Sequence, residues 1–213
     1  MDAVSFILQE RLVAISRGVY GAPLVQAVEE IYAGGFRLLE ITFDQSSKSA
    51  LQNTAKSITL IKEKFRAKMC VGAGTVMTVD QAKAAADAGA DFALAPNTDP
   101  KVIHAMKDLG LTAVPGALTP SEIAMAYNEG ADIVKLFPAS TLGLDYVKAI
   151  RAPISHVPLM AVGGVSVDNV KSFLDNGFCS AGIGSNIINA RKVQDGDFAK
   201  IRAAAEAFIN AIK

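Results

Sequence analysis

The sequence has little cysteine and little histidine, with two residues of each among 213. Two isolated thiols, Cys70 and Cys179, are too few for a disulfide framework or a metal cluster. Both lie in apolar segments typical of strands, so we expect buried structural thiols. His104 and His156 are far apart and have no spaced ligands beside them, which argues against a histidine-based metal site. We therefore expect no metal.

The chain also lacks an excess of either charge and has no long hydrophobic run. Its 21 basic and 21 acidic residues give a formal net charge of zero, and no basic stripe stands out, which makes nucleic acid and anionic membranes poor partners. No apolar stretch approaches the length of a membrane-spanning helix. The first residues carry Asp2 and Glu10 rather than the basic and apolar regions of a signal peptide. We therefore expect a cytoplasmic protein.

The composition instead favours a well-packed interior. Hydrophobic residues make up 51% of the chain, and no low-complexity or proline-rich linker marks a boundary. Single α/β barrels commonly have about this length. We predict one domain over residues 1–213.

Short apolar runs alternate with amphipathic stretches along the whole chain, the pattern of repeated βα units around a parallel sheet. Thr78 followed by Gln81, and Thr119 followed by Glu122, match the capping box that begins a helix. The expected strands are residues 12–16, 38–42, 69–72, 92–95, 112–114, 133–137, 159–162 and 181–184. Eight such units predict a (β/α)8 TIM barrel with an extra N-terminal helix over residues 2–10. An open doubly wound sheet is the competing fold, but residues 16–19 lack its glycine-rich fingerprint.

Lys135 stands in the otherwise apolar run of residues 132–138. Burial disfavours the charged form of lysine, and a neutral amine is a nucleophile that can form a Schiff base with a carbonyl substrate. Two structural interpretations compete with this one: the side chain could extend to solvent from a strand end, or pair with a carboxylate.

Active sites of barrels lie at the carboxyl ends of the strands, so polar residues there are candidates. Arg17 follows the first strand, Glu40 stands in the apolar second strand, and Thr75 follows Gly72-Ala73-Gly74 after the third. Glu40 and Lys135, on neighbouring inner positions, would form either a buried ion pair or a nucleophile with its proton-transfer partner.

Glycines lie at the ends of the last two strands, in Gly163-Gly164 and in Gly182-Ile183-Gly184-Ser185. Such loops expose backbone N–H groups, and barrels frequently bind phosphate after these two strands. Each glycine pair alone is weak evidence, because turns use glycine regardless of ligand. Together they predict a site for phosphate or another anion.

Ordered blocks over nearly the whole chain resemble the class I 2-keto-3-deoxy-6-phosphogluconate (KDPG) and 4-hydroxy-2-oxoglutarate (KHG) aldolases. The blocks are Leu39-Glu40-Ile41-Thr42-Phe43, Val71-Gly72-Ala73-Gly74-Thr75-Val76, Val114-Pro115-Gly116, Thr119-Pro120-Ser121-Glu122, Lys135-Leu136-Phe137-Pro138-Ala139, Gly163-Gly164-Val165 and Gly184-Ser185. The resemblance implies an enzyme that reversibly cleaves KDPG to pyruvate and glyceraldehyde 3-phosphate, and also KHG to pyruvate and glyoxylate.

The same resemblance implies a role for each candidate residue. Lys135 would form the Schiff base, and Glu40 would shuttle protons through a water. The substrate carboxylate would be held by Thr75, Gly74 and Arg17, and the phosphate by Gly163, Gly164, Gly184 and Ser185. The family is trimeric and needs no cofactor beyond the covalent Schiff base, so we expect a homotrimer acting on a small 2-oxo acid.

The chain departs from the family pattern at three places. It has Asp44-Gln45 where an Arg-Thr pair is common, Ala161-Val162 where Pro-Thr is common, and Ser140 where glutamate is common. These departures bear on the distal part of the substrate. Two other functions stay open: another phosphate-binding barrel enzyme (an isomerase, an epimerase or a thiamine-phosphate synthase), and a non-catalytic barrel that binds a small acid.

Overall fold

The computed structural model describes residues 2–213, and nine parallel strands form its single sheet. The strands are β1 (Leu12–Ser16), β2 (Leu38–Thr42), β3 (Cys70–Gly74), β4 (Phe92–Leu94), β5 (Thr112–Val114), β6 (Gly116–Ala117), β7 (Val134–Leu136), β8 (Leu159–Val162) and β9 (Ser180–Ile183). Their order is β5-β4-β3-β2-β1-β9-β8-β7-β6. The predicted strands are confirmed, with ends that differ by at most two residues.

The barrel closes at Pro115, the one residue between β5 and β6, which are the two ends of the strand order. Proline has no N–H to donate to a sheet, so it interrupts the strand. Its carbonyl oxygen still accepts from the Lys135 N–H at 2.9 Å, which joins this strand to β7. The predicted (β/α)8 barrel is therefore confirmed, with its fifth strand split in two.

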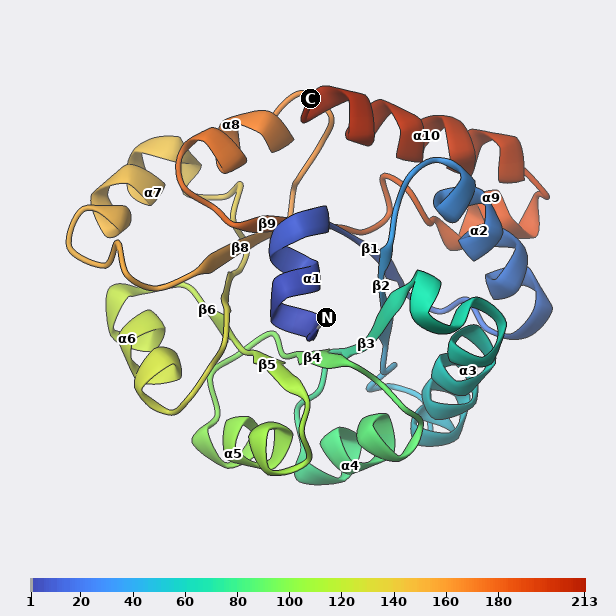
Figure 1. Ribbon diagram of the computed structural model, residues 1–213, viewed down its shortest axis with the longest axis horizontal. Coiled ribbons are helices and arrows are strands. Elements are labelled where there is room, and N and C mark those ends of the chain that lie inside the picture. The colour runs from blue at the N-terminus through green and yellow to red at the C-terminus, as the bar shows by residue number, and fades with distance from the viewer. Residues whose placement is uncertain (1) are drawn as a thin grey trace.

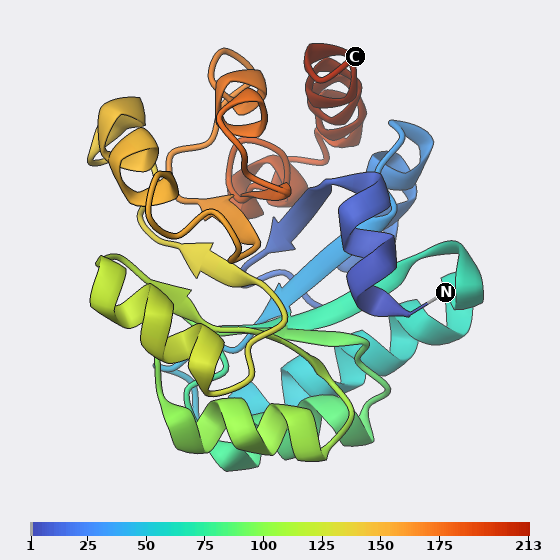
Figure 2. The same cartoon turned by 60° about the vertical axis from the view of Figure 1, so that its left-hand side comes forward.

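Helices alternate with the strands and surround the barrel (Figures 1 and 2). They are α1 (Ala3–Glu10), α2 (Gly21–Ala33), α3 (Ala50–Phe65), α4 (Val79–Asp87), α5 (Pro100–Asp108), α6 (Pro120–Asn128), α7 (Gly143–Arg151), α8 (Val170–Asp175), α9 (Ala190–Gln194) and α10 (Phe198–Ala211), with a short 3-10 helix at Arg66–Lys68. The predicted capping box is complete at Thr119 and Glu122. At α4, Thr78 accepts from the Gln81 N–H as predicted, but the Gln81 side chain bonds the Met77 N–H instead of the cap residue.

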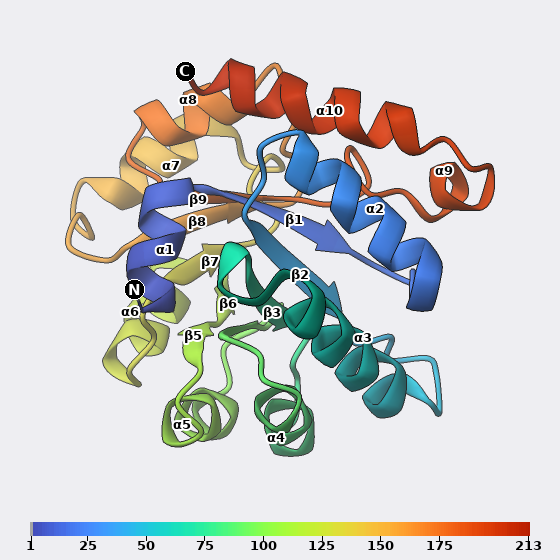
Figure 3. The ribbon, with the colours of Figure 1, turned by 45° about the vertical axis from the view of Figure 1, so that its right-hand side comes forward.

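Alternate residues of each strand face the barrel interior or the helix layer. The interior holds Val13, Leu38, Phe92 and Met160, and α1 closes its amino-terminal end by adding the fully buried Ile7. Figure 3 shows β1 and β2 running away from α1. The carboxyl ends of the strands therefore lie at the opposite end of the barrel, where the candidate residues were predicted.

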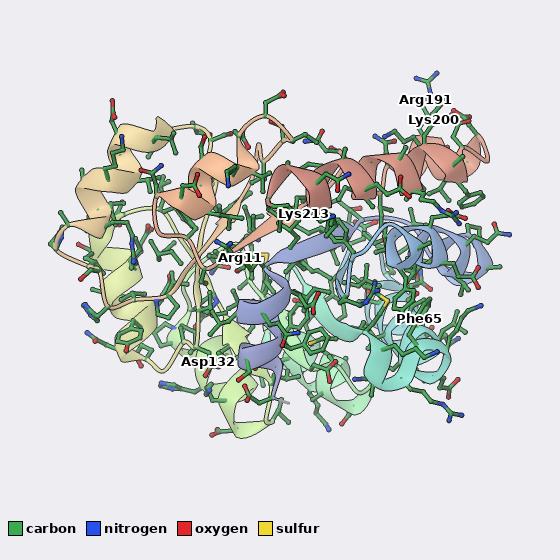
Figure 4. The ribbon with its side chains drawn as sticks, turned by 45° about the horizontal axis from the view of Figure 1, so that its top comes forward. Arg11, Phe65, Asp132, Arg191, Lys200 and Lys213 are labelled. Carbon is green, nitrogen blue, oxygen red and sulfur yellow. The ribbon has the colours of Figure 1, made fainter. Side chains whose placement is uncertain are left out.

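Two aspartates, each just before a strand, stabilise the amino-terminal end of the barrel. Asp132 accepts from the Ala113 N–H at 2.8 Å and pairs with Lys107 at 2.6 Å. Asp91 accepts from the Val71 N–H at 2.8 Å and pairs with Lys62 in the same way. Figure 4 shows Asp132 near α1, whereas Arg191 and Lys200 lie at the far end of α10. These carboxylates are thus part of the framework and distant from the strand ends that carry the candidate site.

Candidate functional site

Lys135 and Glu40 are both buried and face each other across the barrel. Their relative exposures are 6% and 2%. Lys135 lies in β7 and shares its inward face with Ile133, and Glu40 lies in β2 and shares its inward face with Leu38. Strands β1, β9 and β8 separate β2 from β7. The two residues are therefore not on adjacent strands, and closure of the sheet places them on opposite walls, where each still acts electrostatically on the other.

Burial shifts the pKa of both groups in the direction that favours their neutral forms. It lowers the pKa of Lys135, and Arg17 lowers it further, whereas the Glu40 carboxylate raises it. Burial raises the pKa of Glu40, against the lowering effects of Lys135 and Arg17. In the described residues 2–213, the two side chains form no ion pair within 4.0 Å, and Glu40 Oε2 has no hydrogen-bond partner. The arrangement therefore favours a nucleophilic amine and a carboxyl that exchanges protons over a structural ion pair.

Glycines in β3 make room for the Glu40 side chain. A methyl group on Gly74 would overlap Glu40 Oε1 and would lie 2.5 Å from its Cδ atom. A methyl group on Gly72 would overlap the Phe92 ring. Gly72 and Gly74 were predicted to form a loop after the third strand, but both lie within β3. Gly74 therefore determines where the Glu40 carboxyl can sit, in addition to any contact with substrate.

Thr75 follows β3 in a left-handed conformation, with φ of 57°. Non-glycine residues rarely adopt this conformation, and a β-branched residue is an outlier there. Its carbonyl oxygen accepts a hydrogen bond from Gln45 at 2.8 Å. The sequence marked Gln45 only as a departure from the family pattern and gave no sign of its bond to Thr75.

The glycines after β8 and β9 line one cavity of about 590 Å³, together with Arg17. Gly163 and Gly164 have φ of 94° and 72°, which only glycine adopts readily. Gly184 and Ser185 line the same cavity. The four residues predicted to hold phosphate are thus brought together. Arg17, predicted beside the substrate carboxylate, lines this cavity and also acts electrostatically on Lys135.

Two asparagines brace this cavity and were also missed. Asn169 donates from Nδ2 to the Gly164 carbonyl oxygen at 2.9 Å, and Asn186 donates to the Val165 carbonyl oxygen at 2.7 Å. Asn169 Oδ1 accepts from the Ser166 N–H at 2.8 Å, a bond back to the residue three positions earlier in the same loop. These bonds fix the loop that carries the predicted anion cradle.

Neither thiol nor histidine contributes to the site. Cys70 is buried and Cys179 is half-buried, and both are free. In residues 2–213 there is no group of three or more histidine, cysteine, aspartate or glutamate side chains that could hold a metal ion. Among the same residues, no helix is long and apolar enough to cross a membrane.

The family model and the curated relatives identify one family. The family model described as "KDPG and KHG aldolase" matches residues 6–204. The 2-dehydro-3-deoxy-6-phosphogalactonate aldolase of Escherichia coli is 30% identical over 95% of this chain and 96% of its own. The 2-dehydro-3-deoxy-phosphogluconate aldolase of Treponema pallidum is 31% identical over 92% and 89%. A KDPG aldolase structure from Legionella pneumophila, with pyruvate captured as a covalent carbinolamine, shares the fold with a TM-score of 0.86 at 23% identity over 98% of both chains.

Proposed function

Since the chain belongs to the KDPG and KHG aldolase family, we propose that it is a class I aldolase that reversibly cleaves KDPG to pyruvate and glyceraldehyde 3-phosphate. KHG, cleaved to pyruvate and glyoxylate, is a further substrate. The observation that carries this proposal is the buried Lys135, whose pKa burial lowers and which faces Glu40 without an ion pair. A neutral amine opposite a proton-exchanging carboxyl is what a Schiff-base aldolase requires.

The chemistry begins at Lys135. Its neutral amine attacks the C2 ketone of the substrate, and loss of water from the carbinolamine leaves an iminium that can accept an electron pair. Glu40, as carboxylate, takes the proton of the C4 hydroxyl, directly or through a water. The C3–C4 bond then breaks, its electron pair forms the enamine, and the aldehyde leaves. Protonation at C3 and hydrolysis of the iminium release pyruvate and restore the amine.

Binding of the substrate ends is divided between two regions. We assign the carboxylate to Thr75, Gly74 and Arg17, beside Glu40. We assign the phosphate to Gly163, Gly164, Gly184 and Ser185, which line the cavity with Arg17. Backbone N–H groups of glycine-rich loops suit a phosphate, and the arginine adds a positive charge.

The galactonate epimer of the substrate is a second candidate, because the Escherichia coli relative at 30% identity is named for it. The two epimers can be compared directly. Purified protein is given KDPG, its galactonate epimer or KHG, and pyruvate release is followed with lactate dehydrogenase. We expect cleavage of at least one phosphorylated epimer at a kcat/KM above that of KHG, and none by Lys135→Met. If none of the three substrates is cleaved, the proposed function is wrong.

We also propose that the protein is a metal-free, cytoplasmic homotrimer without nucleic-acid or membrane partners. The family resemblance supports the trimer, and a formal net charge of zero is compatible with self-association. Sedimentation equilibrium tests the trimer. We expect the mass of three chains, and the mass of a monomer or dimer would contradict the proposal. Activity after dialysis against a chelator tests the absence of a metal requirement.

A further inference from the structure

Gln45 and Gln81 form a hydrogen-bonded pair beside Thr75. Gln45, in the loop after β2, donates from Nε2 to the Thr75 carbonyl oxygen at 2.8 Å. Gln81, in α4, donates from Nε2 to Gln45 Oε1 at 3.0 Å and accepts at Oε1 from the Met77 N–H at 2.7 Å. The two carboxamides therefore join the β2 loop, the residue after β3 and the first turn of α4.

The polarity of this chain of bonds is fixed at both ends. The Met77 N–H can only donate, so Gln81 must present its oxygen there and its nitrogen to Gln45. The Thr75 carbonyl can only accept, so Gln45 must present its nitrogen there and its oxygen to Gln81. Gln81 is only 7% exposed, which leaves its carboxamide little chance to bond with solvent instead. This pattern of hydrogen bonds requires an amide at both 45 and 81, because a carboxylate cannot donate.

The bond from Gln45 acts on the strained residue of the site. On either side of Thr75 the backbone keeps sheet-like bonds, with Gly74 accepting from the Phe43 N–H at 2.8 Å and Val76 donating to Leu94 at 3.0 Å. The left-handed backbone conformation is thus confined to Thr75. Unfavourable backbone conformations persist only where the surroundings enforce them, and they cluster at functional sites. Within residues 2–213, neither the Thr75 N–H nor its hydroxyl donates to another group, so both donors remain for a ligand.

We propose that Gln45, held by Gln81, is a positioning residue that keeps Thr75 in the conformation that binds the carboxylate of the pyruvyl group. This inference rests on the proposed function. Gln45 touches neither substrate nor Lys135 and acts only through Thr75. Loss of the bond from Gln45 to Thr75 leaves the chemistry of Lys135 and Glu40 intact. It weakens binding of the pyruvyl carboxylate by the same amount in the ground state and in the transition state.

Two nearly isosteric variants test the proposal, Gln45→Glu and Gln81→Glu, with Gln52→Glu on the exposed surface of α3 as the matched control. The readout is the pyruvate concentration that gives half-maximal labelling of Lys135 on borohydride reduction. We expect this concentration to rise about tenfold in both variants, as one lost hydrogen bond implies, and to stay unchanged in Gln52→Glu. Maximal labelling, kcat and the KM for glyceraldehyde 3-phosphate should stay within about twofold of the unmodified protein.

A merely structural role would lower the thermal midpoint and the maximal labelling while leaving the half-saturating pyruvate concentration unchanged. That result, or an equal rise in the KM for the aldehyde, overturns the positioning role. Should Gln45→Glu fail to fold, Gln81→Glu breaks the same chain of bonds one step further from Thr75. Absence of any labelling in the unmodified protein would overturn the proposed function, and the positioning role with it. Normal labelling with unaltered variants would overturn only the positioning role.

Discussion

Gly74→Ala is expected to disable the carboxyl of Glu40 without touching the lysine. The new methyl group would lie 2.5 Å from Cδ and 2.7 Å from Cγ of Glu40, and non-bonded carbons normally approach to about 3.5 Å. The φ of Gly74 is outside the left-handed region, so alanine can adopt the backbone. Glu40, which is 2% exposed, must therefore move by about 1 Å.

A displacement of this size at a catalytic group can cost about a hundredfold in rate. We expect kcat for cleavage of the phosphorylated substrate to fall by that factor, because proton transfer from the C4 hydroxyl loses its geometry. Pyruvate should still label Lys135 on borohydride reduction, since imine formation depends on the amine. Stopped-flow measurement of pyruvate release, paired with peptide mass analysis of the label, gives both quantities.

A double-mutant cycle makes the prediction specific to Glu40. If Gly74→Ala acts by displacing Glu40, then Gly74→Ala combined with Glu40→Gln should be no slower than Glu40→Gln alone. If the double variant shows the product of the two single-variant losses in kcat, the reasoning is refuted. An unimpaired kcat in Gly74→Ala would refute it as well. Thermal unfolding monitored by circular dichroism confirms that each variant is folded.

Two further predictions concern charge and phosphate. Glu40→Gln removes the charge that raises the pKa of Lys135, so the pH midpoint for labelling of Lys135 should move further below the ordinary lysine value of 10.5. The rate of borohydride trapping as a function of pH measures this midpoint, and an upward shift of the midpoint would contradict the electrostatics. Ser185→Ala should raise KM for a phosphorylated substrate about tenfold and leave KM for KHG almost unaffected, because KHG is shorter and has no phosphate to accept from the hydroxyl. Equal changes of both KM values in the pyruvate-release assay would remove Ser185 from the phosphate site.

Most of the fold could be predicted because each βα unit carries its own local signals. The short apolar runs between amphipathic stretches and the capping at Thr119 are properties of neighbouring residues, and they indicated the eight strands. The break at Pro115 also has a local cause, since proline cannot donate to the sheet, but it was not predicted. That the chain forms one domain over its full length stays a prediction.

The sequence named the candidate site residues, whose roles stay predictions, and indicated their geometry only in part. Lys135 and Glu40 stand out because charge in an apolar strand is costly, whatever the fold. Their placement on opposite walls depends on how distant strands pair when the sheet closes, which no local pattern records. The bond from Gln45 to Thr75 was not predictable for the same reason, since Thr75 is thirty residues away and adopts a conformation unusual for threonine.

The central claim, that Lys135 is the nucleophile, is tested most directly by reducing the protein with borohydride in the presence of pyruvate and mapping the label by peptide mass. The claim predicts one label, on the peptide that contains Lys135, and none in Lys135→Met under the same conditions. No label, a label confined to another lysine, or an undiminished label in Lys135→Met would contradict it.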